Sequence, residues 1–131
     1  MALPGTAKVL NSPSPSAAEA AYERLALQMI ERRRLRASFF DAQFFGEHGW
    51  DLLLQLFACH PRQISIDSAA AALELTPSTV MVMARLLVSH GLVEQGDSLG
   101  RWGEIPLRLT EQGHNRVREY LARLHSGGLI G

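Results

Sequence analysis

The residue best suited to redox chemistry in this 131-residue chain is its single cysteine. Cys59 is the only cysteine, and the neighbouring His60 could activate its thiol as a redox sensor. Cys59 also ends a strongly apolar segment, and a cysteine packed in a core is unreactive, so a core position is the favoured interpretation. A single cysteine cannot form an internal disulfide or a zinc site built on several thiolates.

Sequence patterns typical of metal sites and of catalysis are missing. The five histidines form neither H-x-x-x-H nor H-E-x-x-H. The chain has no G-x-S-x-G, Walker A or G-x-G-x-x-G motif, and no carboxylate is paired with a nearby base in sequence. We therefore expect no catalytic residue, no metal ligand and no cofactor, and we expect that the protein is not an enzyme.

The charged residues exclude a strongly basic, non-specific nucleic-acid coat protein, because 13 basic and 13 acidic residues give a net charge of zero. The charges are unevenly spread, and residues 38–75 carry one base and five acids. No apolar run approaches the ~20 residues of a membrane helix. The N-terminus lacks the basic and apolar regions of a signal peptide, so we expect a cytoplasmic protein and no membrane partner.

The sequence pattern predicts three parts: a flexible N-terminal tail at 1–15, a domain at 16–125 and a loose C-terminal tail at 126–131. A capping box at Ser16 predicts a helix that runs to about residue 37. Its apolar stripe is Tyr22, Leu25, Ala26, Met29 and Ile30.

Two apolar segments follow this helix. Four phenylalanines, Phe39, Phe40, Phe44 and Phe45, are expected in the core or in a dimer interface, although they could instead line a small-ligand pocket. Residues 50–59 are apolar on nearly all sides, which predicts a buried core helix ended by Pro61.

Capping residues then mark a pair of helices. Ser65 can cap a short helix over 66–74. Thr76 can cap a longer one over 77–90, with Pro77 at its first position and Gly91 just past its end. Its inward stripe is Val80, Met83, Ala84 and Leu87.

The end of the domain alternates strands and a helix. Residues 92–95 and 104–109 are predicted strands joined by a glycine-rich turn. Pro106 should place the second strand at a sheet edge, since proline cannot donate a ladder hydrogen bond. Thr110 can cap a last helix that runs to about residue 124.

This order of elements is that of a winged helix-turn-helix: mainly α, with a small β-hairpin wing. Over about residues 20–124 the chain resembles the MarR-type winged-helix transcriptional regulators. The matching segments are Arg34–Arg36, W-D-L-L-L at 50–54, L-x-L-T-P-S-T-V at 73–80, G-L-V-E at 91–94 and L-T-E-Q-G at 109–113.

The resemblance implies a homodimer whose stem is made by the first and last helices, and which binds duplex DNA to regulate transcription. The helix at 77–90 would enter the major groove, and the wing at 96–103 would reach the flanking groove or the phosphates. The DNA-binding residues it implies are Ser78, Thr79, Met81, Val82, Arg85 and Arg101. A small-molecule effector is also compatible with this family.

The chain departs from the family pattern at Met81 and Val82, where polar or basic residues are common. Apolar side chains can contact thymine methyl groups but cannot make bidentate hydrogen bonds to guanine or adenine. Arg85 is the only charged residue between Glu74 and Glu94. The alternative is therefore a winged-helix interaction module that binds a protein partner through the apolar Met81/Val82 face.

Overall fold

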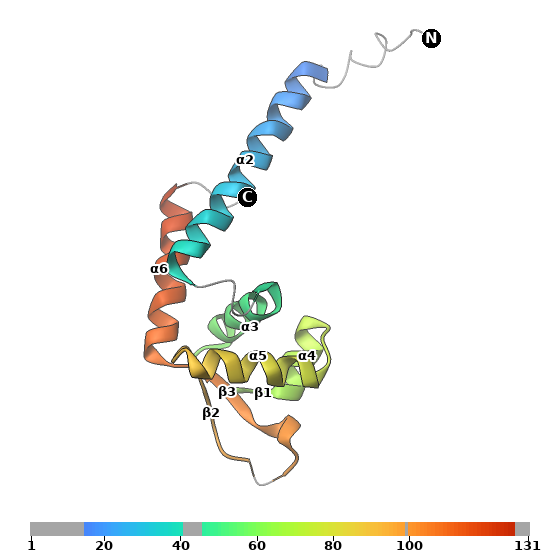
Figure 1. The fold of residues 1–131 in the computed structure, drawn as a ribbon, viewed down its shortest axis with the longest axis vertical. Coiled ribbons are helices and arrows are strands. Elements are labelled where there is room, and N and C mark those ends of the chain that lie inside the picture. Colours follow the sequence, from blue (N-terminus) through green and yellow to red (C-terminus); the bar gives the residue numbers. More distant parts are fainter. Residues whose placement is uncertain (1–14, 41–45, 99, 128–131) are drawn as a thin grey trace, which may run out of the picture.

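The computed structural model describes residues 15–40, 46–98 and 100–127 of the chain (Figure 1). It confirms the expected order of helices and adds a short first strand. In chain order the elements are α2 (Pro15–Phe39), α3 (Gly46–Cys59), β1 (Ile64–Ser65), α4 (Ile66–Leu73), α5 (Pro77–Ser89), β2 (Val93–Gln95), the 3₁₀ turn η2 (Trp102–Glu104), β3 (Pro106–Leu109) and α6 (Glu111–Gly127).

The predicted caps of the two central helices are confirmed. The Ser65 side chain accepts a hydrogen bond from the backbone N–H of Ser68 at 3.0 Å, at the start of α4. The Thr76 hydroxyl accepts from the backbone N–H of Thr79 at 3.2 Å, at the start of α5. These bonds satisfy donors that have no partner within the helix, so local sequence sets both starts. Gly91 has a φ of +76°, as its place after α5 requires.

The outer helix ends differ from the predicted boundaries. Helix α2 begins at Pro15, so Ser16 lies inside the helix and is not its cap. Proline is favoured at the first helical position, because its missing N–H needs no partner there. Helix α6 continues to Gly127, past the predicted domain end at 125. Residues 1–14 and 128–131 of the two predicted tails lie outside the described residues.

The sheet corrects the prediction for Pro106. The strand order is β1-β3-β2 with both pairs antiparallel, so β3 is the central strand and not an edge. Pro106 is tolerated because it is the first residue of β3, and its carbonyl oxygen accepts from the N–H of Gly96 at 2.8 Å. The two-residue partner β1 has no sequence signal of its own.

The core lies where α3, α4, α5 and α6 meet one face of the sheet. Val80, Ala84 and Leu87 of the predicted inward stripe of α5 are fully buried, whereas Met83 is partly buried. The largest side chains buried to at least 98% are Leu52, Leu53, Leu56, Ile66, Leu87, Leu107, Val80, Val93 and Val117. This core holds α5 against the body by one face and leaves its other face in solvent.

Within the described residues, helix α2 packs on this body through its C-terminal part, where Leu35 and Phe39 lie against the core. Phe40, Trp50 and Tyr120 are buried together, with centroid separations of 5.0 to 6.4 Å between their rings, and Phe39 packs on the edge of Tyr120 at 6.0 Å. Phe39 and Phe40 thus confirm the expected core role, while Phe44 and Phe45 lie outside the described residues. The N-terminal part of α2 projects beyond α6 (Figure 1).

Candidate nucleic-acid interface

The turn between α4 and α5 sets the direction of the candidate recognition helix. The chain bends by 111° between the two helices. Glu74 makes this turn in the left-handed region, with φ 56° and ψ 44°, and the N–H of Leu75 donates to the carbonyl of Ala70 at 2.9 Å. In Figure 1, α5 lies across the body beside α4, with the β2–β3 hairpin extending below it.

One face of α5 is free of the core and carries four exposed side chains. They recur at intervals of four, three and four residues, which is the spacing of one helix face. They are Ser78, Val82, Arg85 and Ser89. We call this set the exposed stripe. Val82 is 58% exposed, and Arg85 is the only charged residue of α5. The stripe therefore offers hydroxyls, one cation and one aliphatic group.

The structure separates two of the predicted DNA-binding residues from this stripe. Met81 is partly buried and packs against the core, so it does not share the exposed face with Val82. The Thr79 hydroxyl lies 2.9 Å from the Thr76 hydroxyl, within the helix cap. Ser89, which the sequence interpretation omitted, could have been found by extending the spacing from Arg85 by four residues.

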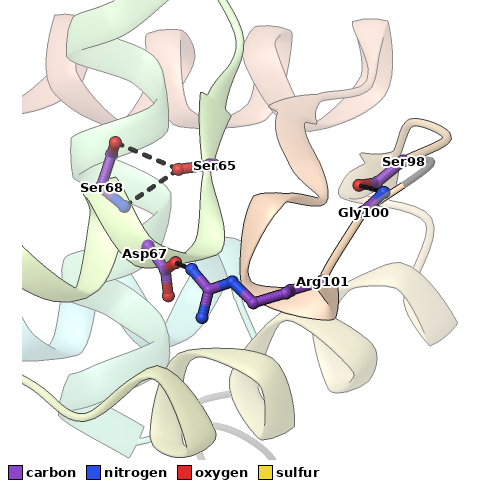
Figure 2. A network of polar contacts seen from close by, with 6 residues as sticks. All are labelled: Ser65, Asp67, Ser68, Ser98, Gly100 and Arg101. Atoms are coloured by element: carbon purple, nitrogen blue, oxygen red, sulfur yellow. Dashed lines mark hydrogen bonds and ion pairs between the residues drawn. The ribbon is translucent and has the colours of Figure 1, made fainter.

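Arg101 is anchored to α4 by an ion pair. Its Nη2 lies 2.9 Å from Oδ2 of Asp67, in the first turn of α4, and Figure 2 shows the side chain reaching across to that carboxylate. The Arg101 side chain is 75% exposed and that of Asp67 39%, so the pair lies at the surface. Sequence spacing gives no signal for Asp67, because it is 34 residues from Arg101.

Close backbone packing supports this ion pair. A Cβ on Gly103 would lie 2.6 Å from Oδ2 of Asp67, so a side chain at this position would displace the carboxylate from its present place. The N–H of Gly100 donates to the Ser98 hydroxyl at 3.2 Å (Figure 2). Trp102, next to Arg101, is 47% exposed. The wing therefore presents one cation and one aromatic ring from a short, hydrogen-bonded turn.

The cysteine and the histidines are the other residues considered for chemistry in the sequence. Cys59 is only partly buried, and the Gln55 amide nitrogen lies 3.6 Å from its sulfur, so its expected core position is only partial. The rings of His60 and His114 stack at 4.0 Å. No group of three or more His, Cys, Asp or Glu side chains among the described residues could hold a metal ion.

An open cavity of about 620 Å³ lies where α2, α3 and α6 meet. Its lining includes Arg32, Arg36, Trp50 and Tyr120, but not Phe39 or Phe40. The Arg36 guanidinium lies 5.3 Å from the Trp50 ring centroid and also pairs with Glu47. This volume is within the range of small-molecule sites, although the described phenylalanines do not form the pocket considered above.

In the described ranges, no single helix is long and apolar enough to cross a membrane. Helices α4 and α5 meet the length and composition criteria only as a pair, which is bent at its break.

Comparison with known proteins supports the fold. The family model of the IclR helix-turn-helix domain matches residues 52–97, which is less than half of the chain. A search of curated proteins finds no match. The chain is similar to RV1404 from Mycobacterium tuberculosis, with 19% identity and a TM-score of 0.68 over 84% of this chain and 73% of that one.

Two further structures resemble the chain. One is S. aureus MepR in complex with DNA, with 18% identity and a TM-score of 0.67 over 83% of this chain and 86% of that one. The other is a MarR family protein from Bacillus stearothermophilus, with 13% identity and a TM-score of 0.62 over 86% and 74%. The chain therefore has the winged helix-turn-helix fold of these proteins, and its sequence resemblance to MarR-type regulators is confirmed for the fold.

Proposed function

We propose that the chain is a sequence-specific, duplex-DNA-binding transcriptional regulator that acts as a homodimer. The observation that carries this proposal is the exposed stripe of α5, which the helix-turn-helix holds away from the core. A similar fold is seen bound to DNA in the S. aureus MepR complex. In this chain α5 would enter the major groove, and the wing at 96–103 would contact the flanking groove or the phosphates.

The residues of the stripe and wing suit different parts of a duplex. Arg85 can make two hydrogen bonds to one guanine in the major groove. The Ser78 hydroxyl, in the first turn of α5, can meet a phosphate near the positive end of the helix dipole. Arg101 retains most of its exposed surface while paired with Asp67, so it can reach a phosphate from a defined position.

The surface of α2 supports the homodimer. Eight large hydrophobic side chains are exposed among the described residues, and five of them belong to α2: Tyr22, Leu25, Leu27, Met29 and Ile30. An apolar surface of this kind on a projecting helix is typical of an interface. A second copy of the chain is the proposed partner, because a two-fold dimer would present two α5 helices to half-sites about one DNA turn apart.

Two arginine substitutions test the proposed roles on a duplex enriched by the wild-type protein from a randomised library. Arg85→Ala should weaken binding to this duplex by about 1–3 kcal/mol and spare binding to a scrambled duplex. Arg101→Ala should weaken both duplexes about equally and reduce the salt slope by about one unit.

The control for these variants is Arg62→Ala, which removes an exposed arginine between α3 and β1, outside α5, the wing and the two proposed stem helices. It should leave both affinities unchanged. Unaltered specificity in Arg85→Ala would contradict the assignment of α5 as the recognition helix.

A protein–protein interaction module is the second candidate function, and the exposed aliphatic group of Val82 is the observation that favours it. In that case no duplex would be enriched from the library. A protein partner would be captured by the wild type and lost from Val82→Asp, a change that leaves the buried face of α5 intact.

A further inference from the structure

Val82 is an isolated aliphatic group in the middle of an otherwise polar stripe. It is 58% exposed, and Ser78 and Arg85 precede and follow it on the same helix face. We propose that Val82 reads the 5-methyl group of a thymine in each half-site, next to the base pair that Arg85 reads. This inference rests on the proposed function and specifies the sequence class that α5 recognises.

The chemistry of the major groove favours thymine over the other bases. Thymine is the only base that presents a methyl group there, whereas the others present hydrogen-bond donors or acceptors. The Val82 isopropyl group cannot hydrogen-bond to such groups, and covering them would leave them unsatisfied at a cost. A β-branched side chain in a helix has one strongly preferred rotamer, so little side-chain freedom is lost on contact.

The spacing along α5 places the two contacts on neighbouring base pairs. Val82 and Arg85 are three residues apart, which is about 4.5 Å along the helix axis. Base pairs repeat about every 3.4 Å along the duplex. The separation of the two side chains is nearest to one base-pair step, so the thymine should lie next to the guanine contacted by Arg85.

The distribution of apolar groups argues against a protein-docking face on α5. The other exposed large hydrophobic of this helix is Val88, six residues further on. At 3.6 residues per turn, that separation puts Val88 about a third of a turn away from Val82 around the helix. The two valines therefore do not form a continuous apolar patch.

The test uses the duplex enriched from a randomised library by the wild-type protein. Each thymine in it is replaced in turn by deoxyuracil, which removes the methyl group and preserves base pairing, and Kd is measured by fluorescence anisotropy. For one thymine in each half-site, replacement should raise Kd about fourfold, which corresponds to the loss of one buried methyl group. Val82→Ala should remove this sensitivity.

The matched control is Val88→Ala, the same substitution at an exposed valine of the same helix outside the stripe. It should keep the wild-type response to deoxyuracil. Alanine is a better helix former than valine, and Val82 is exposed, so the test variant keeps its fold, which circular dichroism verifies.

The outcomes separate this inference from the function on which it rests. If the duplex binds specifically but no deoxyuracil replacement matters, the methyl contact is wrong and the regulator function stands. Sensitivity that persists in Val82→Ala also overturns the assignment of Val82. If no sequence is enriched, the proposed function fails together with the inference.

Discussion

Substitution of Gly113 by alanine tests how the wing is joined to the last helix. Gly113 is the third residue of α6 and is buried. A Cβ there would lie against the carbonyl oxygen of Leu92, 2.9 Å from its carbonyl carbon and 3.1 Å from its Cα. These are backbone atoms just before β2, so a rotamer change cannot relieve the clash.

Hydrogen bonds hold this backbone in place. The Leu92 carbonyl accepts from the N–H of Thr110 at 3.0 Å, and the Thr110 hydroxyl donates to Gly91 at 2.6 Å and accepts from the N–H of Gly113 at 2.9 Å. Overpacking costs about 1–3 kcal/mol, and a strained or lost hydrogen bond adds about 0.5–1.5 kcal/mol. The helix propensity of alanine recovers up to about 1 kcal/mol. We expect Gly113→Ala to lower the free energy of unfolding by roughly 1–3 kcal/mol.

Urea denaturation followed by circular dichroism measures this change. The control is Asn115→Ala, an exposed site two residues along the same helix, which should stay within about 0.5 kcal/mol of the wild type. If Gly113→Ala were as stable as the wild type, the close contact between α6 and Leu92 would be refuted.

Three further predictions concern the wing, the aromatic cluster and the dimer. Asp67→Asn should lower the free energy of unfolding by less than about 1 kcal/mol, because the ion pair with Arg101 is exposed. High salt should reduce this loss by screening the pair. Urea titrations that give the same loss at low and high salt would contradict the prediction. Burial raises the pKa of Tyr120 above its usual 10.0, although Arg36 and Arg32 partly oppose this. The neutral phenol therefore stabilises the fold below about pH 10, and this stabilisation is lost as pH rises through the raised pKa. Tyr120→Phe cannot ionise, so its melting temperature should fall less at alkaline pH than that of the wild type, as thermal melts across pH would show. Ile30→Asp should convert the proposed dimer to a folded monomer in sedimentation analysis, and a variant that remains dimeric would exclude Ile30 from the interface.

Features that depend on neighbouring residues could be predicted from the sequence. Ser65 and Thr76 cap α4 and α5 because each hydroxyl bonds a backbone N–H three residues further on. The buried stripe of α5 follows from the helical period, and the same period places Val82 and Arg85 on the opposite face. This is why both the fold and the centre of the candidate interface could be predicted.

Features that depend on distant residues could not. Pro106 was expected at a sheet edge, but the two-residue strand β1 pairs beside it, and so short a strand has no period to detect. Met81 lies at the border between the two faces of α5, where only the packing decides its exposure. The Asp67–Arg101 pair joins residues that only the folded wing brings together.

The affinity ratio between an enriched and a scrambled duplex is the decisive test of sequence-specific DNA recognition by this chain. Fluorescence anisotropy would measure both Kd values for the wild-type protein at about 50 and about 200 mM salt. We expect the enriched duplex to be bound at least about a thousandfold more tightly than the scrambled one, and both affinities to fall as salt rises. Equal affinity for the two duplexes at the lower salt concentration would contradict sequence-specific DNA recognition by this chain.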